Sequence, residues 1–109
     1  MLDYYINIMP YDIKDLQKLK AKKLGLTIKH SKKKNKKIDV INKDNEVVAS
    51  IGGVKPDGTY YNDYATYIQK LGLKEAKKKR QQYLKRHSKE PKEKDGKKTP
   101  SYYADNILW

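Results

Sequence analysis

The sequence predicts an α+β fold in one small domain, residues 1–109. Three observations support this prediction. The chain has 109 residues, which is the usual length of one domain. Segments with helical apolar spacing alternate with two β-branched runs. Twenty-two Leu, Ile and Val residues, with ten Tyr and one Trp, are enough for a small core.

The first half of the chain is expected to form a helix and a β-hairpin. The helix begins near Pro10 and Asp12 and ends at Gly25. Its expected apolar face consists of Ile13, Leu16, Leu19 and Leu24. Runs at 38–42 and 46–51 are the expected hairpin strands, because Asp44 and Asn45 between them tolerate the backbone angles of a tight turn. Residues 4–8 are a candidate for a further strand.

Two more helices are expected in the second half. Asn62 or Asp63 is placed to cap a short helix that ends at Gly72. A longer helix follows over residues 74–89 and is ended by Pro91. Its expected inner face consists of Ala76, Arg80, Tyr83, Leu84 and His87.

Residues 88–99 form a charged linker that contains no large apolar side chain, so we expect it not to pack. Thr99 and Pro100 then suit the cap and first position of a last helical segment, residues 100–109. This C-terminal anchor contains Tyr102, Tyr103, Ile107, Leu108 and Trp109. We expect it to fold back on the domain; the alternative is docking on another chain.

A net charge of +13, from 26 Lys and Arg against 13 Asp and Glu, predicts an anionic partner. The cations concentrate at 29–37, which we interpret as a mobile basic loop, and at 74–89. Clustered Lys binds phosphates without reading sequence, whereas base readout favours Arg, of which there are two. The alternative for both runs is a solvated surface. The candidate nucleic-acid-binding residues are Lys29, Lys32, Lys33, Lys34, Lys36, Lys37, Lys74, Lys77, Lys78, Lys79, Lys85 and Lys89.

The tyrosines divide into two groups. Tyr60 and Tyr61 follow a Gly- and Pro-containing loop and are candidates for stacking on unpaired bases. Tyr64 and Tyr67 share a helical face with Ile68, which favours core packing. Tyrosine is also common at half-hydrated protein interfaces, so that role stays open for Tyr60 and Tyr61.

The sequence indicates no enzyme, no cofactor and no metal site. There is no cysteine, and the two histidines, His30 and His87, are 57 residues apart without the carboxylate spacing of a metal site or a catalytic triad. The glycines do not form a phosphate-binding loop. We expect no membrane segment, because the chain lacks an apolar run of the necessary length. We expect no signal peptide, because the acidic Asp3 stands where a basic segment would be.

An ordered series of short motifs carries a resemblance. These motifs are Ile51-Gly52, Asp63-Tyr64-Ala65-Thr66-Tyr67-Ile68, Arg80 with Tyr83-Leu84-Lys85-Arg86-His87, Tyr102-Tyr103-Ala104-Asp105, and Leu108-Trp109. Over residues 50–109 the chain resembles small basic proteins of unassigned function encoded by tailed phages and large double-stranded DNA viruses. It departs from them in a longer stretch at 54–61. The resemblance implies a viral origin and a role with the capsid or the genome.

Together these observations predict a non-enzymatic viral protein of the virion that binds viral nucleic acid, expected to be DNA, through lysine. The alternative is a minor capsid protein that cements other capsid proteins through their acidic surfaces. Both place it in the virion and, during infection, inside the host cell; the oligomeric state stays open. The residues expected to form one packing or interface unit are Tyr64, Tyr67, Arg80, Tyr83, Arg86, His87, Tyr103, Leu108 and Trp109.

Overall fold

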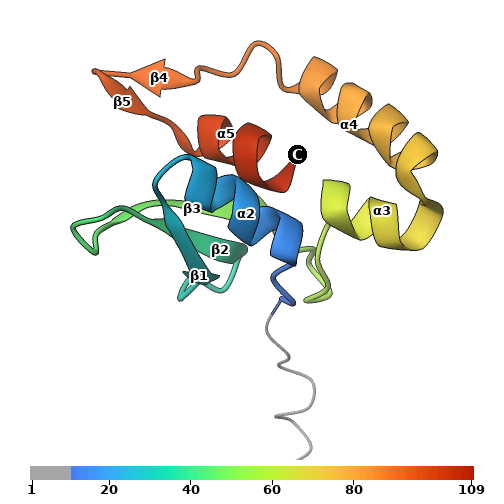
Figure 1. Cartoon of the computed structure of the whole chain (residues 1–109), viewed down its shortest axis with the longest axis horizontal. Coiled ribbons are helices and arrows are strands. Elements are labelled where there is room, and N and C mark those ends of the chain that lie inside the picture. Colours follow the sequence, from blue (N-terminus) through green and yellow to red (C-terminus); the bar gives the residue numbers. More distant parts are fainter. Residues whose placement is uncertain (1–10) are drawn as a thin grey trace, which may run out of the picture.

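The predicted α+β fold is confirmed by the computed structural model, which describes residues 11–109 (Figure 1). Its centre is an antiparallel sheet in the order β1-β2-β3. The strands are β1 (Thr27–His30), β2 (Lys36–Ile41) and β3 (Val47–Gly53). The candidate strand at residues 4–8 lies outside the described residues.

The hairpin of β2 and β3 is the one expected, and its turn is built by asparagine. The side-chain oxygen of Asn42 accepts hydrogen bonds from the backbone N–H groups of Asp44 and Glu46, both at 3.0 Å. Asn45 has a φ of 62°, a left-handed conformation that asparagine adopts readily. The turn residues therefore specify the pairing of the two strands.

One face of the sheet forms the core. Ile28 lies opposite Val40, which lies opposite Ala49, and Ile38 lies opposite Ile51. Because strand side chains alternate between the faces, these five buried residues share one side. Helix α2 (Asp15–Lys23) lies against β1, and the C-terminal helical segments lie against β3, so both cover this side.

The expected apolar face of the first helix is only partly correct: Ile13 packs against the core and Leu16 is half buried, but Leu19 and Leu24 are exposed. Helix α2 buries Gln17 and Ala21, whereas Leu19 is 50% and Leu24 39% exposed. The reason is a specific polar contact: the Gln17 amide donates to the Tyr11 hydroxyl at 2.8 Å. A buried side chain that finds such a partner displaces apolar residues from the inner face of a short helix.

The two middle helices form an arm beside the sheet (Figure 1). Helix α3 (Tyr64–Leu71) begins at Asp63, whose side chain accepts from the Thr66 N–H at 3.1 Å, as one of the two expected caps. At Gly72, with a φ of 85°, the chain turns into α4 (Leu73–Arg86). Helix α4 ends three residues before the predicted end.

The charged segment 88–99 stays largely exposed and outside the core, as expected, but it is ordered. It contains a small hairpin of β4 (Glu93–Lys94) and β5 (Lys97–Lys98). Asp95 and Gly96 between them both have positive φ, 53° and 78°, which matches a two-residue hairpin turn. Polar contacts rather than apolar ones order this segment.

The C-terminal anchor folds back on the domain as expected. Thr99 caps α5 (Pro100–Tyr103) by accepting from the Tyr102 N–H at 3.3 Å, and a π-helical turn, η1 (Ala104–Leu108), follows. Ile107 and Leu108 are buried in the main core cluster together with Trp109. The anchor thus completes the core of its own chain.

Candidate nucleic-acid interface

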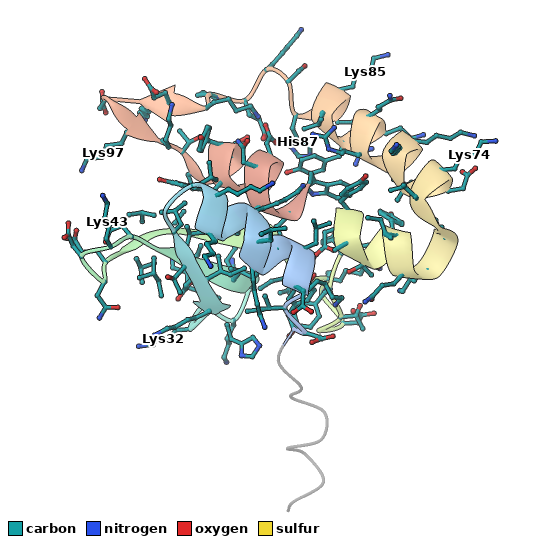
Figure 2. The ribbon with its side chains drawn as sticks, in the orientation of Figure 1. Lys32, Lys43, Lys74, Lys85, His87 and Lys97 are labelled. Atoms are coloured by element: carbon teal, nitrogen blue, oxygen red, sulfur yellow. The ribbon has the colours of Figure 1, made fainter. Side chains whose placement is uncertain are left out.

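The clearest basic surface is the outer side of α4. The helix buries only Ala76 fully, because it contacts the rest of the molecule along one narrow stripe. Figure 2 shows Lys74 and Lys85 extending into solvent from the two ends of the helix. The exposed cations of this segment, which we call the α4 surface, are Lys74, Lys77, Lys78, Lys85, Arg86 and Lys89.

The α4 surface contains little negative charge. Glu75 is the one acid on the helix, and it pairs with Lys78 at 3.3 Å. Both side chains of that pair are about half exposed, so solvent screens the attraction. Lys79 is turned partly inward, with its ammonium group 5.7 Å from the centre of the Tyr67 ring. The surface therefore keeps a strong positive field.

The basic loop expected at 29–37 is wrong in extent. Lys29 and His30 belong to β1, and Lys36 and Lys37 belong to β2, so residues 31–35 alone connect the strands. Beneath this turn the buried Asp39 carboxylate accepts from the Ser31 and Ser50 hydroxyls, both at 2.7 Å. The exposed candidates on this side are Lys29, Lys32, Lys33 and Lys34, while Lys36 is half buried.

Hydrogen bonding keeps Asp39 charged. Burial by itself raises the pKa of this carboxyl. Hydrogen bonds from the Ser31 and Ser50 hydroxyls and the Lys32 N–H lower the pKa by more than burial raises it, so the net shift is downward. The anion inside the turn fixes the backbone from which Lys32 and its neighbours extend. The turn is therefore a defined platform for cations.

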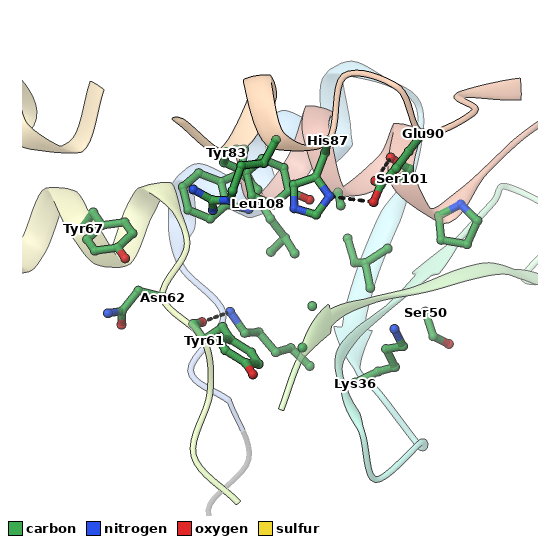
Figure 3. Close-up of a pocket in the computed structure, with 18 residues that line it drawn as sticks. Lys36, Ser50, Tyr61, Asn62, Tyr67, Tyr83, His87, Glu90, Ser101 and Leu108 are labelled. Atoms are coloured by element: carbon green, nitrogen blue, oxygen red, sulfur yellow. Dashed lines mark hydrogen bonds and ion pairs between the residues drawn. The ribbon is translucent and has the colours of Figure 1, made fainter. Parts of the chain in front are cut away.

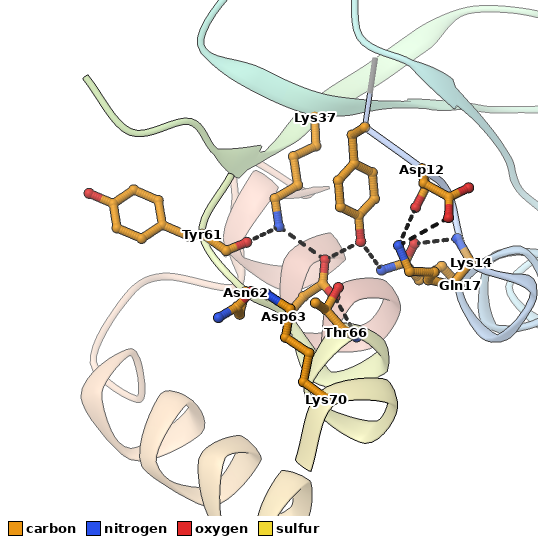
Figure 4. A network of polar contacts seen from close by, with 10 residues as sticks. Asp12, Lys14, Gln17, Lys37, Tyr61, Asn62, Asp63, Thr66 and Lys70 are labelled. Atoms are coloured by element: carbon orange, nitrogen blue, oxygen red, sulfur yellow. Dashed lines mark hydrogen bonds and ion pairs between the residues drawn. The ribbon is translucent and has the colours of Figure 1, made fainter. Parts of the chain in front are cut away.

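Lys37 is not part of any basic surface, and its assignment to nucleic-acid binding is wrong. Its side chain is 2% exposed, and its ammonium group lies 3.0 Å from the equally buried Asp63 carboxylate (Figure 4). The ammonium also donates to the main-chain oxygen of Tyr61. The Tyr11 hydroxyl donates to the same carboxylate. These groups join β2, α3 and the segment before α2.

The charges of this buried network shift one another's pKa. Burial lowers the pKa of Lys37, and the adjacent Asp63 opposes that shift without cancelling it. Burial alone raises the pKa of Asp63, but the Lys37 charge and hydrogen bonds from Tyr11 and Thr66 bring it below its usual value. Burial and the Asp63 charge raise the pKa of the Tyr11 hydroxyl.

Gly52 and Gly53 allow close packing at this network because they lack side chains. A Cβ on Gly52 would lie 2.8 Å from the Lys37 Cγ and Cδ, and one on Gly53 would lie 2.8 Å from the Tyr61 ring. Gly52 also has a φ of 87°. The pair therefore serves close packing of Lys37 and Tyr61.

The two basic regions lie on different sides of the molecule. In Figure 2, Lys32 lies below the sheet, whereas Lys74 and Lys85 lie at the far ends of α4. The α4 surface and the β1–β2 turn are two separate candidate contacts.

The residues expected to pack as one unit come together around Trp109. Tyr83 stacks between His87, at 4.2 Å between ring centroids, and Trp109, at 4.3 Å. Tyr67 lies 6.0 Å from Trp109 in a tilted arrangement. Arg80 Nε donates to the main-chain oxygen of Trp109 at 2.7 Å. The remaining members Tyr64, Tyr103 and Leu108 pack in or against the core, whereas Arg86 lies exposed.

The two stacking candidates differ. Tyr60 is half buried, packs against the core and meets Tyr11 edge to face at 5.3 Å between centroids, which argues against a stacking role. Tyr61 is 54% exposed and lines a cavity of about 680 Å³ (Figure 3). This cavity lies between β3, the end of α4, and α5 with η1. We call it the aromatic groove; its lining includes Lys36, Gly53, Tyr61, Arg86, His87 and Trp109.

Several organising residues escaped the sequence interpretation. The Asp95-Gly96 pair is a strong hairpin signal that marks the β4–β5 turn. Lys92 links three elements: it donates to the His87 carbonyl at 3.0 Å and the Ser101 hydroxyl at 2.7 Å, and pairs with Asp105 at 2.8 Å. A lone lysine in a charged segment gave no signal for this role.

Within residues 11–109, no helix has the length and apolar character needed to cross a membrane. The same part of the chain contains no group of three or more His, Asp or Glu side chains placed to hold a metal ion. Comparison of the chain with protein-family models, with curated proteins and with solved structures found no match.

Proposed function

We propose that this chain is a non-enzymatic virion protein that binds the backbone of viral nucleic acid without sequence preference, with the α4 surface as its main contact. The observation that carries the proposal is one exposed helix with six exposed cations in or just beyond it and a single acid, Glu75, within it. The viral setting rests on the sequence resemblance alone.

The length of α4 suits this role. At 1.5 Å per residue, the 14 residues of α4 extend over about 20 Å. Duplex DNA presents about one phosphate charge per 1.7 Å of axis, so roughly twelve phosphates lie along the same distance. Several lysines along one helix can therefore neutralise phosphates together, releasing counterions with each contact.

The arginine placement favours backbone contacts over base readout. The Arg80 guanidinium donates a hydrogen bond to the Trp109 main-chain oxygen, so this donor is not available to a base. The outer side of α4 thus presents mainly lysine, which acts as a point charge without the fork that recognises guanine.

The test compares two triple variants with equal loss of charge. Lys74→Gln with Lys77→Gln and Lys85→Gln removes charge from the α4 surface. Lys43→Gln with Lys94→Gln and Lys97→Gln removes it from the β2–β3 turn and the β4–β5 hairpin, where all three lysines are exposed. Lys43 and Lys97 lie away from α4 in Figure 2. Binding to a fluorescent duplex is measured by anisotropy over a salt series.

The α4 variant should lose affinity for duplexes of every sequence. The magnitude of its slope of log affinity against log salt should fall by up to about 2.7, at 0.9 per phosphate contact. The control variant should keep the parent slope. Equal effects of the two triples, or no complex of the parent at ~50 mM salt, would refute the proposal.

A further inference from the structure

The aromatic groove combines planar rings with unpartnered positive charge. Arg86 and Lys36 both line it, and neither side chain forms a hydrogen bond or ion pair within the described residues, 11–109. Arg86 comes from the end of α4, and Lys36 comes from the start of β2. Two free cations on different elements thus border one cavity.

The acid at the groove, Glu90, offsets only one of these two charges. Glu90 accepts from the Ser101 hydroxyl at 2.7 Å and contacts His87 Nδ1 at 2.7 Å (Figure 3). These two hydrogen bonds hold the pKa of Glu90 below its usual value. Its carboxylate is therefore ionised and offsets one of the two cations, which leaves the lining with a net positive charge. Lys37, also in the lining, is neutralised by Asp63. The groove is left with affinity for an anion.

Planar surfaces remain available beside the cations. Tyr61 is 54% exposed, with its ring edge against Gly53 and the Lys55 ammonium over the ring at 5.6 Å from its centroid, so one face of the ring remains open. His87 is stacked on Tyr83 on one side, yet 32% of its side chain stays exposed. Arg86 and His87 both line the groove, so a guanidinium and an imidazole ring are available to the same ligand. Stacking on aromatic rings next to Arg is how proteins hold unpaired bases.

From these features the geometry points to a nucleotide site: the aromatic groove binds an unpaired nucleotide, with its base against Tyr61 or His87 and its phosphate on Arg86 and Lys36. The cavity of about 680 Å³ lies within the usual range of ligand pockets. A paired base in a duplex has both faces covered, so the groove selects single strands. This inference deepens the proposed function and rests on it.

The experiment measures the affinity of a fluorescent 15-mer of deoxythymidine and of a 15-base-pair duplex for the parent and three single variants. Arg86→Gln and Tyr61→Leu alter the groove; Lys85→Gln removes a neighbouring exposed cation that does not line it. Each groove variant should weaken single-strand binding about tenfold. Tyr61→Leu should leave duplex binding little changed, whereas Arg86→Gln, which also removes a cation of the α4 surface, should weaken duplex binding only as much as Lys85→Gln does. Lys85→Gln should weaken both ligands to a similar extent.

Free thymidine monophosphate, added to isotope-labelled protein, separates the groove from general attraction to polyanions. Shifts of the Gly52, Gly53 and His87 amide signals that are lost in Tyr61→Leu support the site. If those signals shift with the nucleotide but the 15-mer is unaffected by the groove variants, the ligand is a free nucleotide, and the inference of a strand site fails.

The two proposals fail separately. Duplex binding that depends on the α4 surface, with single-strand binding indifferent to Arg86 and Tyr61, overturns the groove and leaves the proposed function intact. Groove-dependent single-strand binding with no effect of the α4 triple overturns the α4 surface instead. Displacement of the 15-mer by polyglutamate as readily as by unlabelled single strand shows an unselective anion site and also overturns the inference.

Discussion

The two lysine-rich segments of this chain have similar composition and opposite architecture. In 74–89 the lysines are on a helix that contacts the domain along one stripe, so most of them are exposed. In 29–37 two strands enclose a short turn, and the strand that begins at Lys36 carries Lys37 into a fully buried ion pair. A run of like charges therefore does not specify a uniform surface.

The two segments also differ in the free-energy cost of placing their lysines. An exposed lysine retains its hydration, whereas Lys37 loses it and depends on Asp63 for compensation. Substitutions in the two segments should consequently affect different properties: binding for the exposed lysines and folding for Lys37.

The largest effect is expected from Asp63→Asn. This variant retains a side chain able to cap α3, but it leaves the buried Lys37 ammonium without its counterion. The free energy of unfolding should fall by about 3–5 kcal/mol, measured by urea denaturation. Glu75→Gln, which breaks the exposed pair with Lys78, is the matched control and should cost less than about 1 kcal/mol. Similar losses in the two variants would contradict the comparison.

Alanine at Gly52 tests the packing of Lys37 more narrowly. Gly52 and Gly58 have nearly equal φ values, 87° and 88°, so both Gly→Ala variants carry a comparable backbone strain of about 1–2 kcal/mol. At Gly58 nothing lies within 4 Å of the added Cβ, but at Gly52 it meets the Lys37 side chain. Gly52→Ala should therefore be less stable than Gly58→Ala by about 1–3 kcal/mol in thermal or urea unfolding. Equal stabilities would show that Lys37 moves aside freely.

Acid should weaken the fold through its buried carboxylates. The pKa values of Asp63 and Asp39 are lower in the folded chain than their usual values, so the unfolded chain binds more protons in the interval between. Stability is then fully present above about pH 5 and is lost as the pH falls through 4 and below. The slope is at most about 1.4 kcal/mol per pH unit for each proton bound. In Asp63→Asn the slope should be shallower; an unchanged slope would assign the acid sensitivity elsewhere.

The smallest change in stability is expected for the turn. Lys32→Gln, Lys33→Gln and Lys34→Gln alter exposed side chains, so each should change the free energy of unfolding by no more than about 0.5 kcal/mol. If the turn is a second contact for nucleic acid, the triple variant lowers the salt slope without a change in melting temperature. A cooperative loss of folding would show that these three lysines are structural.

Local signals in the sequence were sufficient for much of the fold. The Asp63 cap, the glycine at 72 and the Thr99-Pro100 start each mark a helix end through their own backbone chemistry. Strand β1 was missed because Lys29 and His30 continue a charged run, and one buried residue, Ile28, is too little for a strand pattern. Its pairing with β2 makes it a strand.

The candidate site was less predictable, since its contacts join distant parts of the chain. Nothing near Lys37 indicates that its partner stands 26 residues away at Asp63. The aromatic groove likewise forms where β3, α4 and the C-terminal segment meet, so no single motif describes it. The exposure of the α4 lysines, in contrast, follows from helical periodicity in one segment.

The contacts of Trp109 make its fluorescence a measure of whether α3 and α4 stay packed against the rest of the domain. It is the only tryptophan in the chain, and it contacts Tyr67 of α3 and Tyr83 of α4 and binds Lys20 of α2 through its main-chain oxygen. Its intrinsic emission should therefore respond when the arm swings away, even while the sheet persists. A fluorescence transition that precedes the loss of far-ultraviolet circular dichroism would identify detachment of the arm as a separate, lower-energy opening of the protein.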